Sequence, residues 1–246
     1  MSDMIRTLAE ATNDAPKTIS YRFSPSDSAA VSVNYFDFGG KAEAARLLCF
    51  HGKVSFDDVR YGRDQFRAKK AAGLLPFGQM PMLAYNSAFI PQTNSILRVC
   101  ARVSSDSTLY PISDIVACGQ IDAILDLDAD LFTGVVVANY KERFGFDFLN
   151  NESEVAKVEG VKSNLRTRVF PAHLANLEKM VGEGGWLGGD WSTPTIADFN
   201  FGPRLQYLRD QSLGEPFSLD GYPKLANLIE QFYELDSVKE YYKQNE

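Results

Sequence analysis

Three short stretches of this 246-residue chain hold residue types that could bind and activate a small molecule. The first alternates apolar and polar residues from Val31 to Tyr35, as a short strand does, and the Gly39–Gly40 turn and an amphipathic helix follow it. A tyrosine at that place can direct its hydroxyl at whatever binds beside the helix N-terminus. Taken alone, a strand tyrosine is more often a core residue with a satisfied hydroxyl. Tyr35 is therefore a candidate that the other two stretches must support.

The second and third stretches are Met80–Pro81, which enters a predicted strand, and Gln92–Thr93, which joins a strand to a helix. A proline entering a strand can simply interrupt its edge, and its peptide bond is trans by default. A threonine at a helix start can simply be the N-cap, with no role in binding. The same helix N-terminus, however, offers unpaired N–H groups and a partial positive charge that suit a carboxylate.

Together the stretches resemble the thiol-binding domain of the glutathione S-transferases, and the sigma class most of all. The segment YFDFGGKAE that begins at Tyr35 is similar to the sigma pattern Tyr-Phe-x-x-Arg-Gly-Arg-Ala-Glu, although both arginines are missing and Lys41 stands at the second. The resemblance covers about residues 31–242 and is strongest before Val103. It implies an α/β plus all-α fold, in which a thioredoxin-like, glutathione-binding domain precedes a helical bundle domain.

In that family a tyrosine activates the thiol of glutathione, and Tyr35 falls at its place. A free thiol has a pKa of about 8.5, and a phenol that donates a hydrogen bond to the sulfur favours the thiolate. A pKa shift of about two units corresponds to roughly 2.7 kcal/mol. Serine and cysteine classes place their catalytic side chain near the start of the first helix. Gly39–Gly40 and Lys41 occupy that region here, which disfavours those mechanisms.

The resemblance also implies how the rest of glutathione is held. Met80–Pro81 is expected to be cis, with the Met80 backbone paired to the cysteinyl main chain, and Gln92–Thr93 to hold the γ-glutamyl end. Further glutathione contacts are implied by position. Lys41 falls at the second arginine of the sigma pattern, and Gln79 replaces a lysine that precedes Met80–Pro81 in the family. Phe66 falls where a tryptophan contacts the glycyl end of glutathione, and Lys70 falls near the family's lysine at that end.

Asp130 matches the acid that reaches the γ-glutamyl amine of the glutathione in the partner subunit, which implies a homodimer. It could equally belong to a solvated acidic helix face. No metal is expected, because Ala129 stands where a metal-binding acidic cluster needs a carboxylate.

A second substrate is implied too, a small apolar electrophile that the enzyme would detoxify by conjugation. Its pocket is expected between the segment that ends at Phe38 and the long helix that starts at Ile115, with Phe38, Phe132 and Val136 as its lining.

Two alternatives to a conjugating transferase stay open. One is a glutathione-dependent prostaglandin-H2 D-isomerase of the same fold, although Val137 stands where that enzyme has an aromatic residue. The other is a non-catalytic binding or structural protein like the lens crystallins. The retention of Tyr35, Gln92 and Thr93 together disfavours it.

Composition excludes several other function classes. The net charge is −7 with no basic cluster, which argues against nucleic acid or an anionic membrane as the main partner. Two histidines without a second ligand at metal spacing disfavour a zinc site or a Ser-His-Asp triad. Three cysteines without paired spacing, Cys49, Cys100 and Cys118, are interpreted as buried structural thiols. With no apolar run for a membrane span or signal peptide, these features predict a cytoplasmic protein.

The pattern divides the chain into four parts. Residues 1–30 are polar and are expected to be disordered or loosely docked; residues 31–103 form the α/β domain, 104–113 a linker and 114–246 the helical domain. Within the second part we expect a helix over 41–50, a strand over 54–59, a helix over 64–72, a hairpin over 82–90 and a helix over 93–103. In the last part we expect helices over 115–140, 152–180, from a capping box at Thr195–Asp198 to 208, 223–233 and 236–242.

Overall fold

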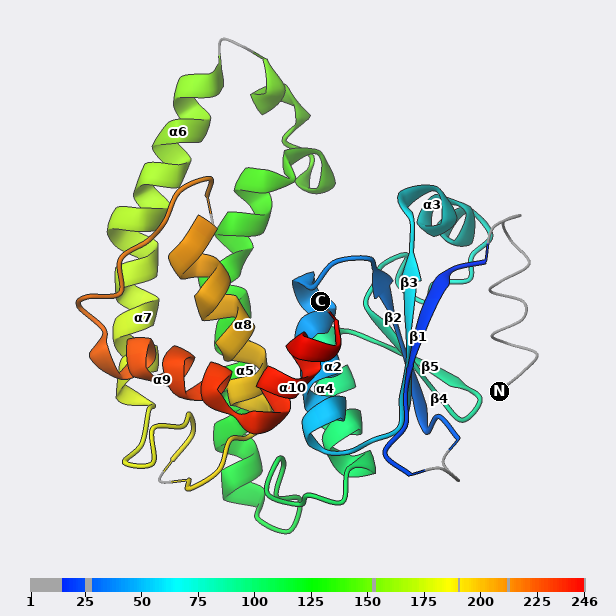
Figure 1. Cartoon of the computed structure of the whole chain (residues 1–246). Coiled ribbons are helices and arrows are strands. Elements are labelled where there is room, and N and C mark those ends of the chain that lie inside the picture. The colour runs from blue at the N-terminus through cyan, green and yellow to red at the C-terminus, as the bar shows by residue number, and fades with distance from the viewer. Residues whose placement is uncertain (1–14, 25–27, 152–153, 190, 212, 246) are drawn as a thin grey trace. The chain divides into compact units, whose positions relative to one another are not determined.

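The computed structural model describes residues 15–24, 28–151, 154–189, 191–211 and 213–245. The chain divides into two compact units. The first comprises Met1–Tyr110 and Leu235–Glu246, and the second comprises Pro111–Glu234 (Figure 1).

The first unit is built on a five-stranded sheet with the order β1-β3-β2-β4-β5. Its central pair, β2 (Val31–Phe36) and β3 (Phe56–Tyr61), is parallel, and every other pair is antiparallel. A parallel pair needs a crossover, which α2 (Glu43–His51) provides. The predicted hairpin is confirmed as β4 (Met82–Tyr85) and β5 (Ala88–Pro91), with Asn86 at a φ of 52° in its turn.

Among the described residues, a 3-10 turn (Gly40–Ala42) and four α-helices complete the first unit, and the α-helices are labelled in Figure 1. They are α2, α3 (Arg63–Ala71), α4 (Thr93–Val103) and α10 (Asp236–Gln244). The helix expected over 93–103 is confirmed, and the strand expected over 54–59 lies two residues further on. The aromatic ring of Tyr241 in α10 packs edge-on against Phe50 of α2 at 5.6 Å between centroids. Cys49 and Cys100 are buried free thiols, as expected, whereas Cys118 is only half-buried, so the expectation is wrong for that cysteine.

The expectation of a disordered or loosely docked N-terminal extension is wrong for part of its length. Lys17–Tyr21 forms strand β1, which pairs with β3 from Lys17 opposite Arg60 to Tyr21 opposite Phe56. The ring of Tyr21 stacks on Phe56 at 4.5 Å, and its hydroxyl donates a hydrogen bond to Asn245 Oδ1 at 2.7 Å. Residues 1–14 and 25–27 of the expected extension lie outside the described residues.

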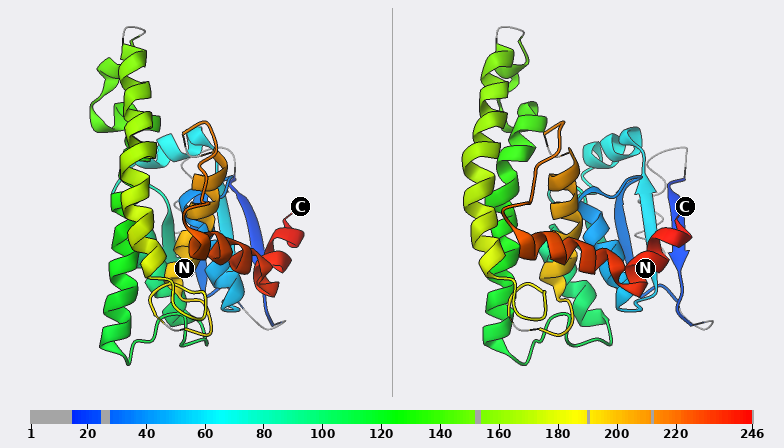
Figure 2. Two further views of the ribbon diagram at one scale, coloured as in Figure 1. Left: turned by 90° about the vertical axis from the view of Figure 1, so that its left-hand side faces the viewer. Right: turned by 60° about the vertical axis from the view of Figure 1, so that its left-hand side comes forward.

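The second unit is helical. Its first helix, α5 (Ile115–Asn139), matches the expected range to within one residue. The helix expected over 152–180 is divided into α6 (Val155–Asn164), a π-helical turn (Leu165–Val169) and α7 (Phe170–Lys179). Figures 1 and 2 show α5 and the α6–α7 path side by side. Two 3-10 turns (Lys141–Phe144 and Asp147–Asn150) precede α6, and α8 (Ile196–Gln211) and α9 (Pro223–Glu234) complete the unit.

The capping box predicted before α8 is confirmed. The Asp198 carboxylate is fully buried and accepts hydrogen bonds from the Thr195 N–H at 2.7 Å and the Thr195 hydroxyl at 3.2 Å. Its other oxygen accepts from the Leu187 N–H at 2.8 Å, a contact that the sequence did not indicate. Asp198 therefore joins the start of α8 to the loop before it. Among the described residues, none of the helices is long and apolar enough to cross a membrane.

Candidate functional site

Tyr35 stands at the end of β2 with 7% of its surface exposed. Its hydroxyl oxygen accepts a hydrogen bond from the backbone N–H of Lys41, with a donor–acceptor distance of 3.4 Å. A hydroxyl that accepts one hydrogen bond still has its own proton to donate. The geometry therefore suits Tyr35 as a hydrogen-bond donor to a bound atom.

The turn after β2 requires glycine at Gly40. Its φ is +50°, a conformation that side-chain-bearing residues rarely adopt. A Cβ atom there would lie 2.7 Å from the ring of Phe38 and 2.9 Å from the hydroxyl oxygen of Tyr35. The glycine turn noted in the sequence thus lets the backbone approach the tyrosine hydroxyl closely.

The sheet register brings the three candidate stretches to one place. Asn34 of β2 lies opposite Met82 of β4, and Met82 lies opposite Pro91 of β5. The chain positions that adjoin these paired residues lie at one end of three neighbouring strands. They are Tyr35, Met80–Pro81 and Gln92–Thr93.

Two backbone features mark this end of the sheet. The Met80–Pro81 peptide bond is cis, as expected. Gln92, the N-cap of α4, has a φ of 73°, and such outliers in non-glycine residues cluster at functional sites. Thr93 is the first residue of α4 rather than its N-cap. The N-terminus of an 11-residue helix, with its partial positive charge, thus lies at the same end of the sheet as Tyr35 and Pro81.

Aromatic rings surround Tyr35. Phe38 lies 5.4 Å from Tyr35 between ring centroids and stacks on Phe36 at 5.7 Å, and Phe36 contacts Phe66 edge-on at 5.1 Å. Phe38 is 54% exposed, whereas Phe66 is half-buried against Leu75 and Met82. Phe38 and Phe66, expected in two different roles, therefore belong to one cluster with Tyr35.

Lys41, Lys70 and Gln79 are exposed. Lys70 lies beside the loop that carries Gln79, because a Cβ atom on Gly78 would be 3.4 Å from Lys70 Cε. Of the expected polar contacts, Lys70 and Gln79 are thus near one another.

Arg46 is a site-supporting residue that the sequence reasoning missed. Its side chain has no exposed surface, and its Nε donates to Asp58 Oδ1 at 2.9 Å. The rest of its guanidinium faces the turn after β2, donating to the carbonyl oxygens of Phe38 at 2.7 Å and Phe36 at 3.1 Å. The available signal was an arginine inside the apolar stretch Ala44–Leu48 of α2.

Lys69 was also missed, since the family pattern directed attention to its neighbour Lys70. It is 1% exposed, and no hydrogen-bond partner for its Nζ exists within the described structure. The Nζ lies 4.8 Å from the ring centroid of Tyr61 on β3. Burial lowers the pKa of the Lys69 ammonium to about 8.

The remaining expected residues lie on α5 in the second unit. Asp130 is exposed and Val136 is half-buried. Phe132 is buried, with the guanidinium carbon of Arg204 3.7 Å from its ring centroid, and Arg204 pairs with Asp128 at 2.8 Å. No group of three histidine, cysteine, aspartate or glutamate side chains in the part of the chain that the structure describes could hold a metal ion.

Similarity to known proteins identifies the family of the chain. Residues 145–245 match the family model of the glutathione S-transferase C-terminal domain. The chain is 31% identical over 168 residues to glutathione S-transferase 2 of Caenorhabditis elegans, covering 66% of this chain and 82% of the relative. The chain belongs to the glutathione S-transferase family. It is an enzyme of the glutathione transferase type, and glutathione is the co-substrate of that family.

Two further comparisons extend over most of this transferase. It is 25% identical over 211 residues to the hematopoietic prostaglandin D synthase of Gallus gallus, covering 84% of this chain and 92% of the relative. A crystal structure of a nematode-specific glutathione S-transferase of C. elegans aligns with a TM-score of 0.72 over 88% of this chain and 97% of that chain, at 20% identity. The expected two-part transferase fold is confirmed.

Proposed function

We propose that this transferase conjugates glutathione to small apolar electrophiles, with Tyr35 as the residue that activates the thiol. The observation that carries the proposal is the placement of Tyr35, Met80–Pro81 and the N-terminus of α4 at the same end of three neighbouring strands. That arrangement offers a phenolic donor, a main chain beside a cis peptide bond and a positive helix end. Glutathione has a thiol, a peptide backbone and a carboxylate that match them.

Glutathione binding would use these groups as follows. The helix N-terminus at Gln92–Thr93 attracts the γ-glutamyl carboxylate, and the Met80 main chain pairs with the cysteinyl residue as an added strand would. The glycyl end would be held by Phe66 and Lys70 of α3, and Lys41 and Gln79 would make further contacts with glutathione.

In the chemical step the bound thiol loses its proton to solvent, and Tyr35 donates a hydrogen bond to the resulting thiolate. A thiol pKa lowered by about two units raises the thiolate fraction at neutral pH roughly twenty-fold. A sulfur electron pair then attacks the electrophilic carbon, the C–S bond forms, and the leaving group departs with its bonding electrons. Phe38, 54% exposed and beside Tyr35, would contact the electrophile.

We also propose a sigma-like enzyme that works as a cytoplasmic homodimer. The YFDFGGKAE segment supports the class, while its two missing arginines separate it from the usual sigma pattern. Asp130 is exposed on α5, as a residue that reaches the glutathione of a partner subunit must be.

A prostaglandin D-isomerase is the second candidate, favoured by the similarity to the hematopoietic prostaglandin D synthase. Val137 and the missing arginines count against it. Product analysis with prostaglandin H2 separates the two, because an isomerase returns glutathione unchanged and a conjugating enzyme consumes it. A crystallin-like protein without turnover would bind glutathione weakly or not react at all.

The test is the rate of glutathione conjugation to 1-chloro-2,4-dinitrobenzene for the wild type and Tyr35→Phe. A wild-type rate well above background that falls roughly twenty-fold in the variant supports the proposal. Activity that survives the substitution assigns thiol activation to another group. Glutathione binding without conjugation favours the isomerase or a binding protein.

A further inference from the structure

Arg46 carries a cation into the interior of the first unit. A guanidinium without exposed surface is costly unless its donors are paired. One edge of the fork is paired with the carboxylate of Asp58 at 2.9 Å. The other donors go to backbone carbonyl oxygens, of Phe38 at 2.7 Å, Phe36 at 3.1 Å and Gly39 at 3.4 Å, and one of them also lies 3.4 Å from the carboxylate of Glu43. Most of the pairing of this cation is therefore with a single turn of the backbone.

That turn is the one that shapes the surroundings of Tyr35. The three carbonyl groups bracket the chain between the end of β2 and Gly40, whose missing side chain allows contact with the tyrosine. The next residue, Lys41, donates its backbone N–H to the Tyr35 oxygen. The guanidinium carbon of Arg46 itself lies 5.9 Å from the centroid of the Tyr35 ring.

We propose that Arg46 is a positioning residue, which holds the turn of residues 36–40 so that the Lys41 N–H and the Tyr35 hydroxyl keep the geometry that stabilises the glutathione thiolate. The inference rests on the proposed role of Tyr35. Arg46 touches the turn and the ring, and it acts on the sulfur only through them.

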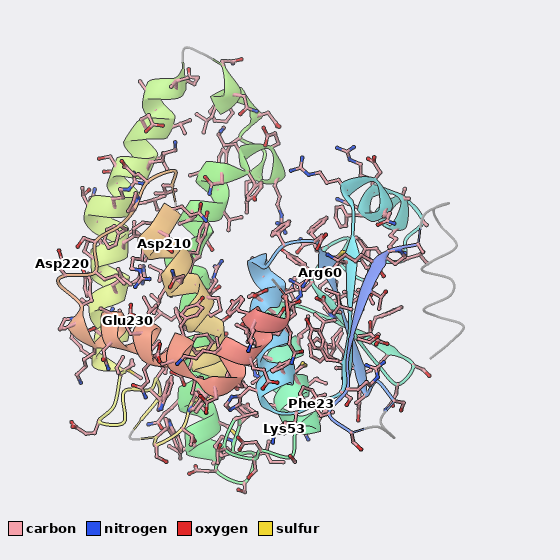
Figure 3. All side chains as sticks on the ribbon, viewed as in Figure 1. Phe23, Lys53, Arg60, Asp210, Asp220 and Glu230 are labelled. Carbon is pink, nitrogen blue, oxygen red and sulfur yellow. The ribbon has the colours of Figure 1, made fainter. Side chains whose placement is uncertain are left out.

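The surrounding charges allow the role of Arg46 to be separated from simple support of the fold. Asp58 is shared with Arg60, whose Nε donates to its second oxygen at 2.7 Å. Arg60, labelled in Figure 3, also pairs with Asp37 at 3.0 Å, and Asp37 lies 3.5 Å from Lys17. Loss of Arg46 thus leaves Asp58 with a cationic partner, whereas the three carbonyl groups of the turn lose their shared donor. The Glu43 carboxylate, 3.4 Å from Arg46, also loses this cation, and Arg46→Lys separates that loss of charge from the loss of the hydrogen bonds to the turn.

The experiment measures the pKa of the thiol of enzyme-bound glutathione, by ultraviolet absorbance of the thiolate, in the folded full-length protein. Arg46→Gln is expected to raise that pKa by about one unit, which lowers the thiolate fraction roughly tenfold at pH values below the pKa. Arg46→Lys keeps the charge but lacks the planar fork, so it should raise the pKa by a smaller amount. Arg22→Gln is the matched control, because Arg22 bridges Asp57 at 2.7 Å and the Phe56 carbonyl at 2.9 Å without contacting the turn. Its thiol pKa should equal that of the wild type.

A double-mutant cycle tests whether Arg46 acts through the tyrosine. If it does, Arg46→Gln combined with Tyr35→Phe gives the same thiol pKa as Tyr35→Phe alone. Additive shifts overturn the inference, as does an unchanged thiol pKa in Arg46→Gln. If the glutamine variant does not fold, an unchanged thiol pKa in Arg46→Lys overturns it.

The outcome for Tyr35→Phe separates the inference from the proposed function. If Tyr35→Phe itself leaves the thiol pKa unchanged, the proposed function is wrong, and so is the inferred role of Arg46. If Tyr35→Phe raises the pKa and the Arg46 variants do not, only the inference about Arg46 is wrong.

Discussion

The ammonium nitrogen of Lys69 lies 4.8 Å from the ring centroid of Tyr61, in a region where Lys69 is 1% exposed. A cation over an aromatic face gains some stabilisation, but it does not replace the hydrogen bonds lost on burial. The Tyr61 hydroxyl is directed elsewhere, donating to Asn34 Oδ1 at 2.9 Å. Burial accordingly lowers the pKa of Lys69 to about 8 from a usual 10.5.

We predict from this that Lys69→Met stabilises the protein. In the wild type the folded state binds fewer protons than the unfolded state between about pH 8 and 10.5, so its free energy of unfolding rises with pH across that window. The variant lacks this rise and should be more stable below pH 8 by about 1–3 kcal/mol. Denaturant melts of both proteins across the window measure the difference. Lys70→Met, at the exposed neighbouring position, is the control and should show no such pH-dependent difference from the wild type.

Gly40→Ala is predicted to impair both folding and conjugation. The new Cβ would stand 2.7 Å from the Phe38 ring and 2.9 Å from the Tyr35 oxygen, so one of them must move. We expect kcat/KM to fall by at least roughly tenfold, since a displacement of about 1 Å at a reacting group has large effects. Gly73→Ala is matched in backbone conformation, with a φ of +69° and no atom within 4 Å of the added Cβ. It should cost about 1 kcal/mol of stability and leave kcat/KM unchanged; equal losses in both variants would contradict the prediction.

Asp198→Ala should destabilise the second unit without affecting thiol activation. The substitution leaves the buried N–H groups of Leu187 and Thr195 without their acceptor, which costs about 1–3 kcal/mol for each group. We expect the free energy of unfolding to fall by about 2–4 kcal/mol, read from denaturant melts, with the thiol pKa of bound glutathione as in the wild type. Burial raises the pKa of Asp198 to about 7, so its contribution is full below about pH 3.8 and is lost as the pH rises through 7. The difference in free energy of unfolding between the wild type and Asp198→Ala should therefore decrease as the pH approaches neutral.

Phe38→Ala is predicted to weaken the reaction of an aromatic electrophile and to spare glutathione binding. Phe38 presents an exposed ring beside Tyr35, and an aromatic pair is worth about 0.5–1.5 kcal/mol. We expect kcat/KM for 1-chloro-2,4-dinitrobenzene to fall about two- to tenfold, with an unchanged Kd for glutathione. Phe148→Ala serves as the control, because Phe148 is 57% exposed and lies in the other unit. If the substitution changes the Kd for glutathione more than kcat/KM for the electrophile, Phe38 contacts glutathione and the prediction is wrong.

The sequence predicted best where the signal was local. The hairpin around Asn86, the helix that begins at Thr93 and the capping box at Asp198 each depend on residues close in the chain. The cis bond before Pro81 followed from a family pattern.

What the sequence did not indicate depends on distant partners. β1 has only two apolar residues, Ile19 and Tyr21, and becomes a strand through β3, more than thirty residues away. Arg46 stands in an otherwise apolar helix, and its partners, Asp58 and the turn after β2, lie elsewhere in the chain, so the sequence pattern gave no prediction for it. Periodicity could not decide which of two adjacent lysines turns inward, and the buried one is Lys69.

The division of the chain also has a consequence for its synthesis. The first unit contains β1 near the beginning and α10 at the end, joined by the hydrogen bond between Tyr21 and Asn245. The second unit lies between them in the chain as an uninterrupted stretch. On the ribosome, the five-stranded sheet is translated first, but its unit lacks its last helix until all of Pro111–Glu234 has emerged. The part of the enzyme that begins to form first is thus the last to be completed.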